Sequence, residues 1–222
     1  MGTSLNMEQV LVFLDGLRHN NNKAWFDSHR PAYQVARSTF EAFINDLIDE
    51  FRISDDLAGL SARDCIARIY RDIRFTKDKS PYKTNLGALI APGGWRSTRQ
   101  GYYISVEPQG CSMVAGGLHD PTPEQLERFR QAISRNAAAF QRVTQHKDFV
   151  AAFGEVQGER LKTAPKGYDR THPEIALLQL KQITAIHAFT DEAVVAGDFR
   201  ERVISACRSL RSFLDILDEI LE

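Results

Sequence analysis

Three short apolar runs in the middle of the chain constrain its fold more than any other feature. They cover residues 86–90, 102–106 and 112–115, and they are rich in apolar, aromatic or β-branched side chains. Each run ends at a turn signal, namely APGG at 91–94, EPQG at 107–110 and the glycine pair at 116–117. Short strands separated by such turns are typical of an antiparallel meander. We therefore expect a mostly antiparallel sheet within a strand-rich region at 66–117.

The segments on both sides of this region have the spacing of helices. Apolar residues recur every three to four positions over 7–53 and again over 122–222. This spacing places apolar side chains on one face of a helix. Helices followed by a sheet and then by helices predict an α+β fold, with a central sheet flanked by N- and C-terminal helices. We expect a single domain over 1–222, because the chain shows no internal repeat, low-complexity run or obvious linker.

Several helix starts are marked by residues that satisfy free backbone N–H groups. Asn22 is suited to cap a helix that begins at Lys23. Pro31 fits the first turn of the helix after it. Thr122 and Gln125 have the spacing of a capping box, with a proline between them at the first helical position. These signals predict helices that begin near residues 23, 30 and 123.

The charge balance and the cysteines exclude several classes of protein. The 222 residues carry 28 Lys and Arg against 29 Asp and Glu, so the whole molecule does not attract DNA or acidic lipid strongly. Cys65, Cys111 and Cys207 are widely spaced and odd in number, which favours three small buried side chains over a disulfide framework. The chain shows no apolar run of roughly 20 residues and no signal-peptide pattern. We expect a soluble cytoplasmic protein without a membrane partner.

The segment IARIYRDIRFTKDKSPYKTN at 66–85 is the best candidate for a functional site. Its six basic residues are interleaved with large apolar ones, a pattern that a solvated charge run does not need. If 68–75 is a strand, alternate side chains point to opposite faces, with neighbours on one face about 6–7 Å apart. One face then carries Arg68, Tyr70, Asp72 and Arg74, and the core-facing side carries Ile69, Ile73 and Phe75. Asp72 would orient the two arginines beside it for a phosphate or carboxylate.

Arg71 falls on the apolar face of this strand and needs an explanation. A buried charge without a partner is strongly unfavourable, so Arg71 must have a carboxylate partner, reach the strand edge or point at a ligand from a bulge. The loop that follows is restricted by Ser80-Pro81 and would hold Lys77, Lys79, Tyr82 and Lys83. A helical period also fits the segment, although its β-branched and aromatic content favours a strand. A solvated basic loop with salt bridges is the structural alternative.

A second basic loop, LKTAPKGYDRTHP at 161–173, has a similar character. It contributes Lys162, Lys166 and Tyr168 as ligand-binding candidates. His172 is suited to cap a helix opened by Pro173, and the N-termini of helices attract anions. A histidine at such an end is also a candidate acid–base group. The structural alternative is a capped loop in which proline and glycine serve the turn.

The remaining motifs indicate structure more than chemistry. The three asparagines of NNNKAWF at 20–26 would bind a polar ligand beside Trp25, but asparagines in such clusters more often serve turns and helix caps. The six histidines show no HxxxH, HExxH or HxH spacing, so we predict no metal site. The chain also lacks the GxxxxGK[ST], GxGxxG and GxSxG motifs of phosphate loops, dinucleotide sites and nucleophile elbows.

Five segments together resemble one known family. They are NNNKAWFDSHRPAY at 20–33, RIYRDIRFTKDKSPYKTN at 68–85, GYYISVEP at 101–108, VAGGLHDPTPEQLERFR at 114–130 and LKTAPKGYDRTHPEI at 161–175. In this order they are similar to the conserved hypothetical proteins of domain of unknown function 2461, with Thr76 at a position where serine is more usual. The resemblance implies one domain of about this length. It supplies no activity, cofactor or catalytic residue.

The residues therefore predict a site for a small ligand that bears a phosphate or carboxylate. The first loop contributes Arg68, Arg71, Arg74, Lys77, Lys79, Tyr82 and Lys83, and the second contributes Lys162, Lys166 and Tyr168. If the site is catalytic, His172 or Asp72 is the candidate acid–base group. Two alternatives remain open, a nucleic-acid-binding surface whose aromatic residues stack on bases and a purely structural Arg–Asp network. The sequence indicates neither a cofactor nor an oligomeric state.

Overall fold

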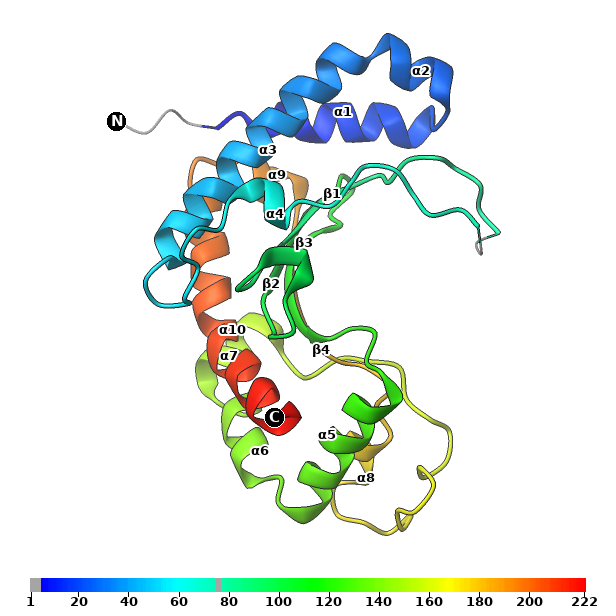
Figure 1. The fold of residues 1–222 in the computed structure, drawn as a ribbon, viewed down its shortest axis with the longest axis vertical. Coiled ribbons are helices and arrows are strands. Elements are labelled where there is room, and N and C mark those ends of the chain that lie inside the picture. Colours follow the sequence, from blue (N-terminus) through cyan, green and yellow to red (C-terminus); the bar gives the residue numbers. More distant parts are fainter. Residues whose placement is uncertain (1–4, 75–76) are drawn as a thin grey trace. The chain divides into compact units, whose positions relative to one another are not determined.

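The computed structural model describes residues 5–74 and 77–222 (Figure 1). These residues form ten α-helices, one short 3-10 helix and a four-stranded antiparallel sheet. The predicted α+β class, with helices at the N- and C-terminal ends of the chain and an antiparallel sheet between them, is confirmed. No helix in the described ranges combines the length and the apolar character that a membrane span requires.

The N-terminal helices are α1 (Met7–His19), α2 (Lys23–Ser28), α3 (Arg30–Phe51) and α4 (Ala62–Cys65). The predicted helix starts are confirmed, because Asn22 Oδ1 accepts a hydrogen bond from Trp25 N at 3.0 Å and Pro31 lies in the first turn of α3. The apolar stripe of α3 is fully buried, and α3 packs against α1 and β1. This packing forms the core on which the first candidate loop is mounted.

The sheet has the strand order β1 (Leu86–Ile90), β2 (Tyr102–Val106), β3 (Ser112–Leu118) and β4 (Ile183–Phe189). The bounds of β1 and β2 are those predicted from the sequence. The glycine pair at 116–117 lies inside β3, so its interpretation as a turn is wrong. The other glycine pair does form a turn and leads into the 3-10 helix η1 (Gly94–Arg96). β4 is a further correction, because it lies within the region predicted as helical.

The C-terminal helices are α5 (Pro123–Arg135), α6 (Ala138–Thr144), α7 (Lys147–Phe153), α8 (Ile175–Leu178), α9 (Asp191–Val195) and α10 (Phe199–Leu221). The predicted capping box of α5 is confirmed, with Thr122 and Gln125 bonded to each other's backbone N–H groups. Helix α8 begins at Ile175 and not directly after Pro173. The second basic loop, predicted at 161–173, lies in the irregular segment between α7 and α8.

The chain divides into two compact units. The first unit comprises Met1–Ser97, Tyr103–Val114 and Ala188–Ile204, and the second comprises Thr98–Tyr102, Ala115–His187 and Ser205–Glu222. The core of the second unit contains four phenylalanine rings in contact, those of Phe129, Phe140, Phe149 and Phe213. The single domain predicted from the sequence stays a prediction.

The three cysteines are free thiols. Cys65 and Cys207 are buried, as predicted, and burial raises the pKa of the Cys65 thiol to about 12. Cys111 is exposed, so the prediction of three buried cysteines is wrong at this position. Cys111 belongs to the turn between β2 and β3, where a small side chain has no core to enter.

Candidate functional site

Residues 66–74 and 77–88 form the two sides of an irregular ribbon, here called the basic arm. The predicted strand at 68–75 belongs to its first side. Ala67 N donates to Gly87 O at 2.9 Å, and Lys83 N donates to Ile69 O at 2.8 Å. Between these two pairs Arg68 alone stands opposite three residues, 84–86. Such a bulge interrupts the pairing. The described residues of 66–74 therefore form isolated bridges with the other side of the arm, and the prediction of a continuous strand is wrong. Phe75 lies outside the described residues.

The predicted alternation of side chains nevertheless holds along the arm. Arg68, Tyr70, Asp72 and Arg74 are all exposed. Ile69, on the opposite face, is only 3% exposed. Tyr70 and Tyr82 face each other across the ribbon, with ring centroids 5.3 Å apart. The arm therefore presents a row of polar and aromatic side chains to solvent while its apolar face is covered.

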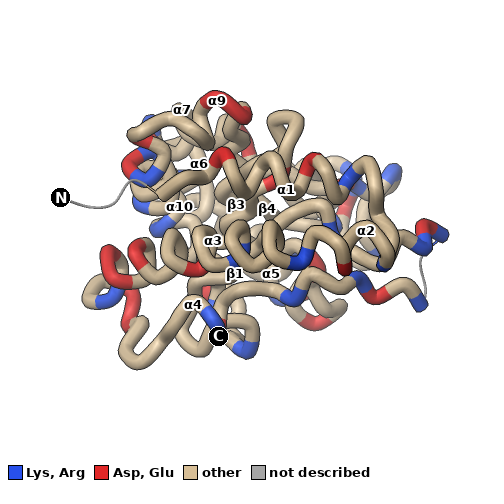
Figure 2. Tube along the Cα trace, turned by 90° about the horizontal axis from the view of Figure 1, so that it is seen from above, with Lys and Arg blue, Asp and Glu red and all other residues tan. Residues whose placement is uncertain are grey.

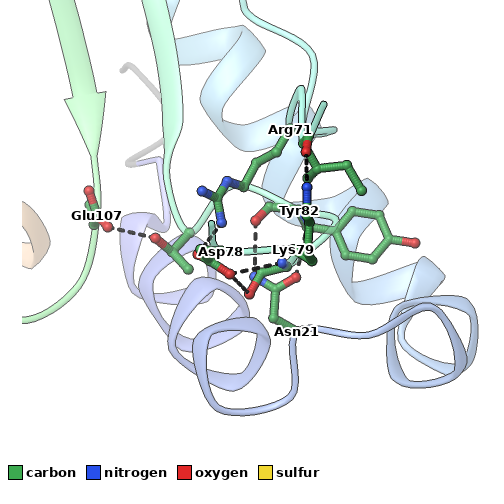
Figure 3. Close-up of polar contacts among 9 residues, drawn as sticks. Asn21, Arg71, Asp78, Lys79, Tyr82 and Glu107 are labelled. Carbon is green, nitrogen blue, oxygen red and sulfur yellow. Dashed lines mark hydrogen bonds and ion pairs between the residues drawn. The ribbon is translucent and has the colours of Figure 1, made fainter. Parts of the chain in front are cut away.

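Arg71 has the carboxylate partner that its position on the apolar face required. Its guanidinium forms an ion pair with Asp78, and Figure 3 shows the two side chains pointing toward each other. Asp78 Oδ1 also accepts hydrogen bonds from Ser80 Oγ at 2.7 Å and Ser80 N at 2.9 Å. The bonds from Ser80, and then Arg71, lower the pKa of Asp78 far below its usual range. The pair holds the two sides of the arm together.

Two further cations of the arm are bound to partners within it. Arg74 Nη2 lies 2.6 Å from Asp72 Oδ2 and Arg74 Nε lies 3.0 Å from Asp72 Oδ1. The predicted pairing of Asp72 is thus confirmed for Arg74, whereas Arg68 forms no ion pair with Asp72 among the described residues. The hydrogen bonds from Arg74, and more weakly the charge of Arg68, lower the pKa of Asp72. Lys79 Nζ donates to Ile73 O at 2.8 Å. The interactions of Arg74 and Lys79 therefore match the structural alternative, a solvated basic loop with salt bridges.

Asn21 fixes the backbone of the arm at Tyr82. Its amide Nδ2 donates to Tyr82 O at 2.9 Å and its Oδ1 accepts from Tyr82 N at 3.1 Å, across 61 residues of sequence (Figure 3). The Tyr82 ring stacks on Phe26 of α2, with centroids 4.1 Å apart and an interplanar angle of 12°. Tyr82 is only 4% exposed. Tyr82 therefore anchors the arm. The capping role foreseen for the asparagine cluster is confirmed at Asn22, whereas the bonds of Asn21 to Tyr82 were not predicted.

Arg68 and Lys83 differ from Arg71, Arg74 and Lys79, which have partners within the arm. Within the described parts of the chain, neither side chain has a carboxylate within ion-pair distance or a hydrogen bond to an acceptor. Lys83 is half-buried, and burial and then the positive charge of Arg68 lower its pKa. Their backbones are adjacent, because Lys83 pairs with Ile69. Lys77 is exposed. Two neighbouring cations without an internal counter-ion are suited to bind an anion.

Polar residues just before β1 and along β2 to its end, which sequence reasoning missed as site residues, continue from Lys83. Thr84 Oγ1 donates to Glu107 Oε1 at 2.7 Å, and Asn85 Nδ2 donates to Ser105 Oγ at 2.8 Å and to Tyr103 Oη at 3.2 Å. Tyr103, Ser105 and Glu107 occupy every second position along β2 and its end. This period of two in the sequence is the signal that would have placed them on one face of the sheet.

The second basic loop belongs to the second unit and is described by itself. Tyr168 Oη donates to Glu127 Oε1 of α5 at 3.1 Å, and burial and Glu127 raise the pKa of Tyr168. His172 Nδ1 accepts from Glu174 N at 3.0 Å, so His172 caps the turn before α8. Lys162 and Lys166 are exposed. These contacts match the capped-loop interpretation. Among the residues that the structure describes, no three His, Cys, Asp or Glu side chains gather as metal ligands do.

The fold and the arm define an α+β protein with a basic, aromatic ribbon beside its sheet. A family model described as conserved hypothetical protein (DUF2461) matches residues 9–215. The chain therefore belongs to this family, and the resemblance seen in the sequence is confirmed. No curated protein and no solved structure matches the chain.

Replacing Asn21 by alanine is expected to destabilise the protein by about 1–3 kcal/mol, because the backbone N–H and C=O of buried Tyr82 lose their partner. Denaturation in urea measures the change. Asn20→Ala is the matched control, since among the described residues the Asn20 side chain makes one hydrogen bond, to Gly16 O, and is exposed. Equal stabilities of the two variants would show that the bonds to Tyr82 are not required.

Proposed function

We propose that the protein binds a small phosphate- or carboxylate-bearing ligand at Arg68 and Lys83 of the basic arm. The observation that carries this proposal is that the backbones of two cations are adjacent and that neither side chain has an ion pair among the described residues. The arm contains two aspartates, but Asp72 is bound to Arg74 and Asp78 to Arg71. The carboxylates closest in sequence are thus already engaged with other arginines.

The chemistry of the two side chains is complementary. The planar fork of Arg68 is suited to two parallel hydrogen bonds with a phosphate or carboxylate, whereas Lys83 supplies a compact point charge. An anion between them would also relieve the repulsion that their own charges create. Arg71, Arg74 and Lys79 then act indirectly, because their internal partners keep the arm in shape.

The distribution of charge favours a compact anion over a long polyanion. Figure 2 shows that acidic and basic positions alternate toward the outer end of the arm. Asp72 and Asp78 stand among its cations, and the net charge of the chain is −1. A nucleic acid follows a continuous run of positive charge.

The ionised and paired state of Asp72 makes this carboxylate a poor general base, since its pKa is lowered.

Calorimetric titration with sulfate tests the site, because this anion carries the same charge throughout the neutral range. We expect wild-type protein to bind sulfate, and Arg68→Gln and Lys83→Met to weaken the binding at least tenfold each, the loss of one charge-assisted contact. Arg74→Gln removes the same charge from the same arm, but Arg74 is already paired with Asp72. It should bind sulfate almost as well as wild type.

The results separate the proposal from its alternatives. Sulfate at about 100 times its dissociation constant should add nearly 3 kcal/mol of stability in a thermal-shift experiment. Equal losses in Arg68→Gln and Arg74→Gln would indicate a diffuse charge effect. No response to sulfate or phosphate in either experiment would contradict the proposed function.

The affinity for sulfate is expected to fall as the pH rises through the pKa of Lys83. In the free protein this pKa lies below the ordinary 10.5, because burial and Arg68 disfavour the charged form. A bound anion favours the charged form and raises the pKa, so the contribution of Lys83 to binding is full below the free-state pKa and declines above it. Calorimetry between pH 7 and pH 10 measures the fall. Lys83→Arg should keep its affinity over this range, and an unchanged fall in that variant would exclude Lys83 as its source.

A further inference from the structure

We infer that the ligand of the Arg68–Lys83 site carries a planar ring that stacks on Tyr70, an inference that rests on the proposed function. Tyr70 lies on the exposed row of the arm, two residues after Arg68, and 50% of it is exposed to solvent. A large aromatic side chain with half of its surface in water leaves apolar area uncovered. A ring of the ligand would cover it.

Tyr70 is held in place by other aromatic rings, so its free surface is preformed. Its ring contacts Tyr82 at a centroid distance of 5.3 Å and Phe26 at 6.4 Å. Tyr82 is in turn stacked on Phe26 and clamped by Asn21. Because these neighbours fix the phenol ring before any ligand arrives, little conformational entropy is lost when a second ring stacks on it.

The spacing of Arg68 and Tyr70 sets the chemical class of the ligand. Arg68 and Tyr70 both lie on the exposed row and are separated by Ile69, where the chain bends. A ligand that contacts both side chains must therefore carry an anionic group and a ring in one small molecule. A mononucleotide, whose ribose separates base and phosphate, and an aryl phosphate both have this form. Tyrosine offers a π-face that accepts any base.

The test compares three anions that bind the same two cations. Inorganic phosphate has no ring, phenyl phosphate has a planar ring, and cyclohexyl phosphate has an apolar ring of similar size that is not planar. Calorimetry on wild-type protein should show phenyl phosphate binding about 5- to 150-fold more tightly than inorganic phosphate, the range that corresponds to stacking of one ring on an aromatic side chain. Cyclohexyl phosphate should gain much less.

Variants of Tyr70 test whether the tighter binding of phenyl phosphate comes from the Tyr70 ring. Tyr70→Leu should remove the preference for phenyl phosphate and keep the affinity for inorganic phosphate, whereas Tyr70→Phe should keep both. Because Tyr70 is half-exposed, both variants are expected to remain folded, which circular dichroism verifies. Arg68→Gln should weaken all three anions together.

The possible outcomes separate the inference from the proposed function. Equal binding of phenyl and cyclohexyl phosphate, or a preference that survives Tyr70→Leu, would overturn the stacking inference and leave the anion site intact. Failure of all three anions to bind would overturn both. Strong binding of an oligonucleotide, with a steep loss in salt and no preference for phenyl phosphate over phosphate, would overturn the inference in favour of a nucleic-acid surface.

Discussion

Gly117→Ala is expected to destabilise the second unit by about 3–5 kcal/mol, the middle of the range of about 2–6 kcal/mol that positive-φ strain and overpacking give together at about 1–3 kcal/mol each. Gly117 lies in β3 with φ +106°, a backbone conformation that disfavours a side chain. A Cβ at this position would stand 2.2 Å from Ile183 O of β4 and 2.9 Å from Phe213 Cε1. Because the carbonyl is part of the backbone, the two strands would have to move apart. Thermal unfolding should show a decrease of roughly 6–20 °C in Tm.

Two other glycines allow the cost of the positive φ to be measured apart from the cost of the steric clash. Gly110 has φ +69° with no atom within 4 Å of the added Cβ, so Gly110→Ala should cost only the left-handed strain of about 1–2 kcal/mol. Gly197 has open space around it and no positive φ, and its alanine variant should stay within about 0.5 kcal/mol of wild type. A Gly117→Ala variant no less stable than Gly110→Ala would show that β3 and β4 do not approach each other this closely.

The misinterpretation of Gly117 illustrates which parts of the fold the sequence can predict. Local signals were sufficient for β1 and β2, which end at turns, and for the caps of α2 and α5, whose donors and acceptors lie three residues apart. A glycine pair after a short apolar run is also a local signal for a turn. Here Gly117 serves the close approach of Ile183 and Gly116 that of Leu214, both far along the chain. Pairing at that distance leaves no trace in the neighbouring residues.

The candidate site shows the same division between local and distant interactions. The pairing of Asp72 with Arg74 and the need of Arg71 for a carboxylate followed from residue spacing alone. The clamp from Asn21 to Tyr82 did not, because 61 residues separate the two partners. The bulge opposite Arg68 was also hidden, since it depends on the register between two segments. The sequence therefore identified the basic arm, and the fold separated its paired cations from Arg68 and Lys83.

The aromatic base of the arm leads to the second large effect, which is expected at Phe26. This side chain is 1% exposed and contacts rings from α1, α3 and the arm. Phe26→Ala removes the ring on which Tyr82 stacks and leaves a cavity, at an expected loss of about 3–5 kcal/mol. Denaturation in urea measures the loss. Phe26→Leu keeps most of the apolar volume and should lose less, while Val12→Ala, on the exposed side of α1, should stay within about 0.5 kcal/mol of wild type.

A double-mutant cycle shows whether Phe26 acts through the arm or only through the helical core. Phe26→Ala and Tyr82→Ala should couple by about 0.5–3 kcal/mol, because the rings are in direct contact. Phe26→Ala and Val12→Ala should be additive. If the arm is the binding element, Phe26→Ala should also weaken sulfate binding under conditions where the variant is folded, although Phe26 carries no charge. Additive losses for Phe26 and Tyr82, with unchanged sulfate affinity, would show that the arm does not depend on this stack for its binding-competent shape.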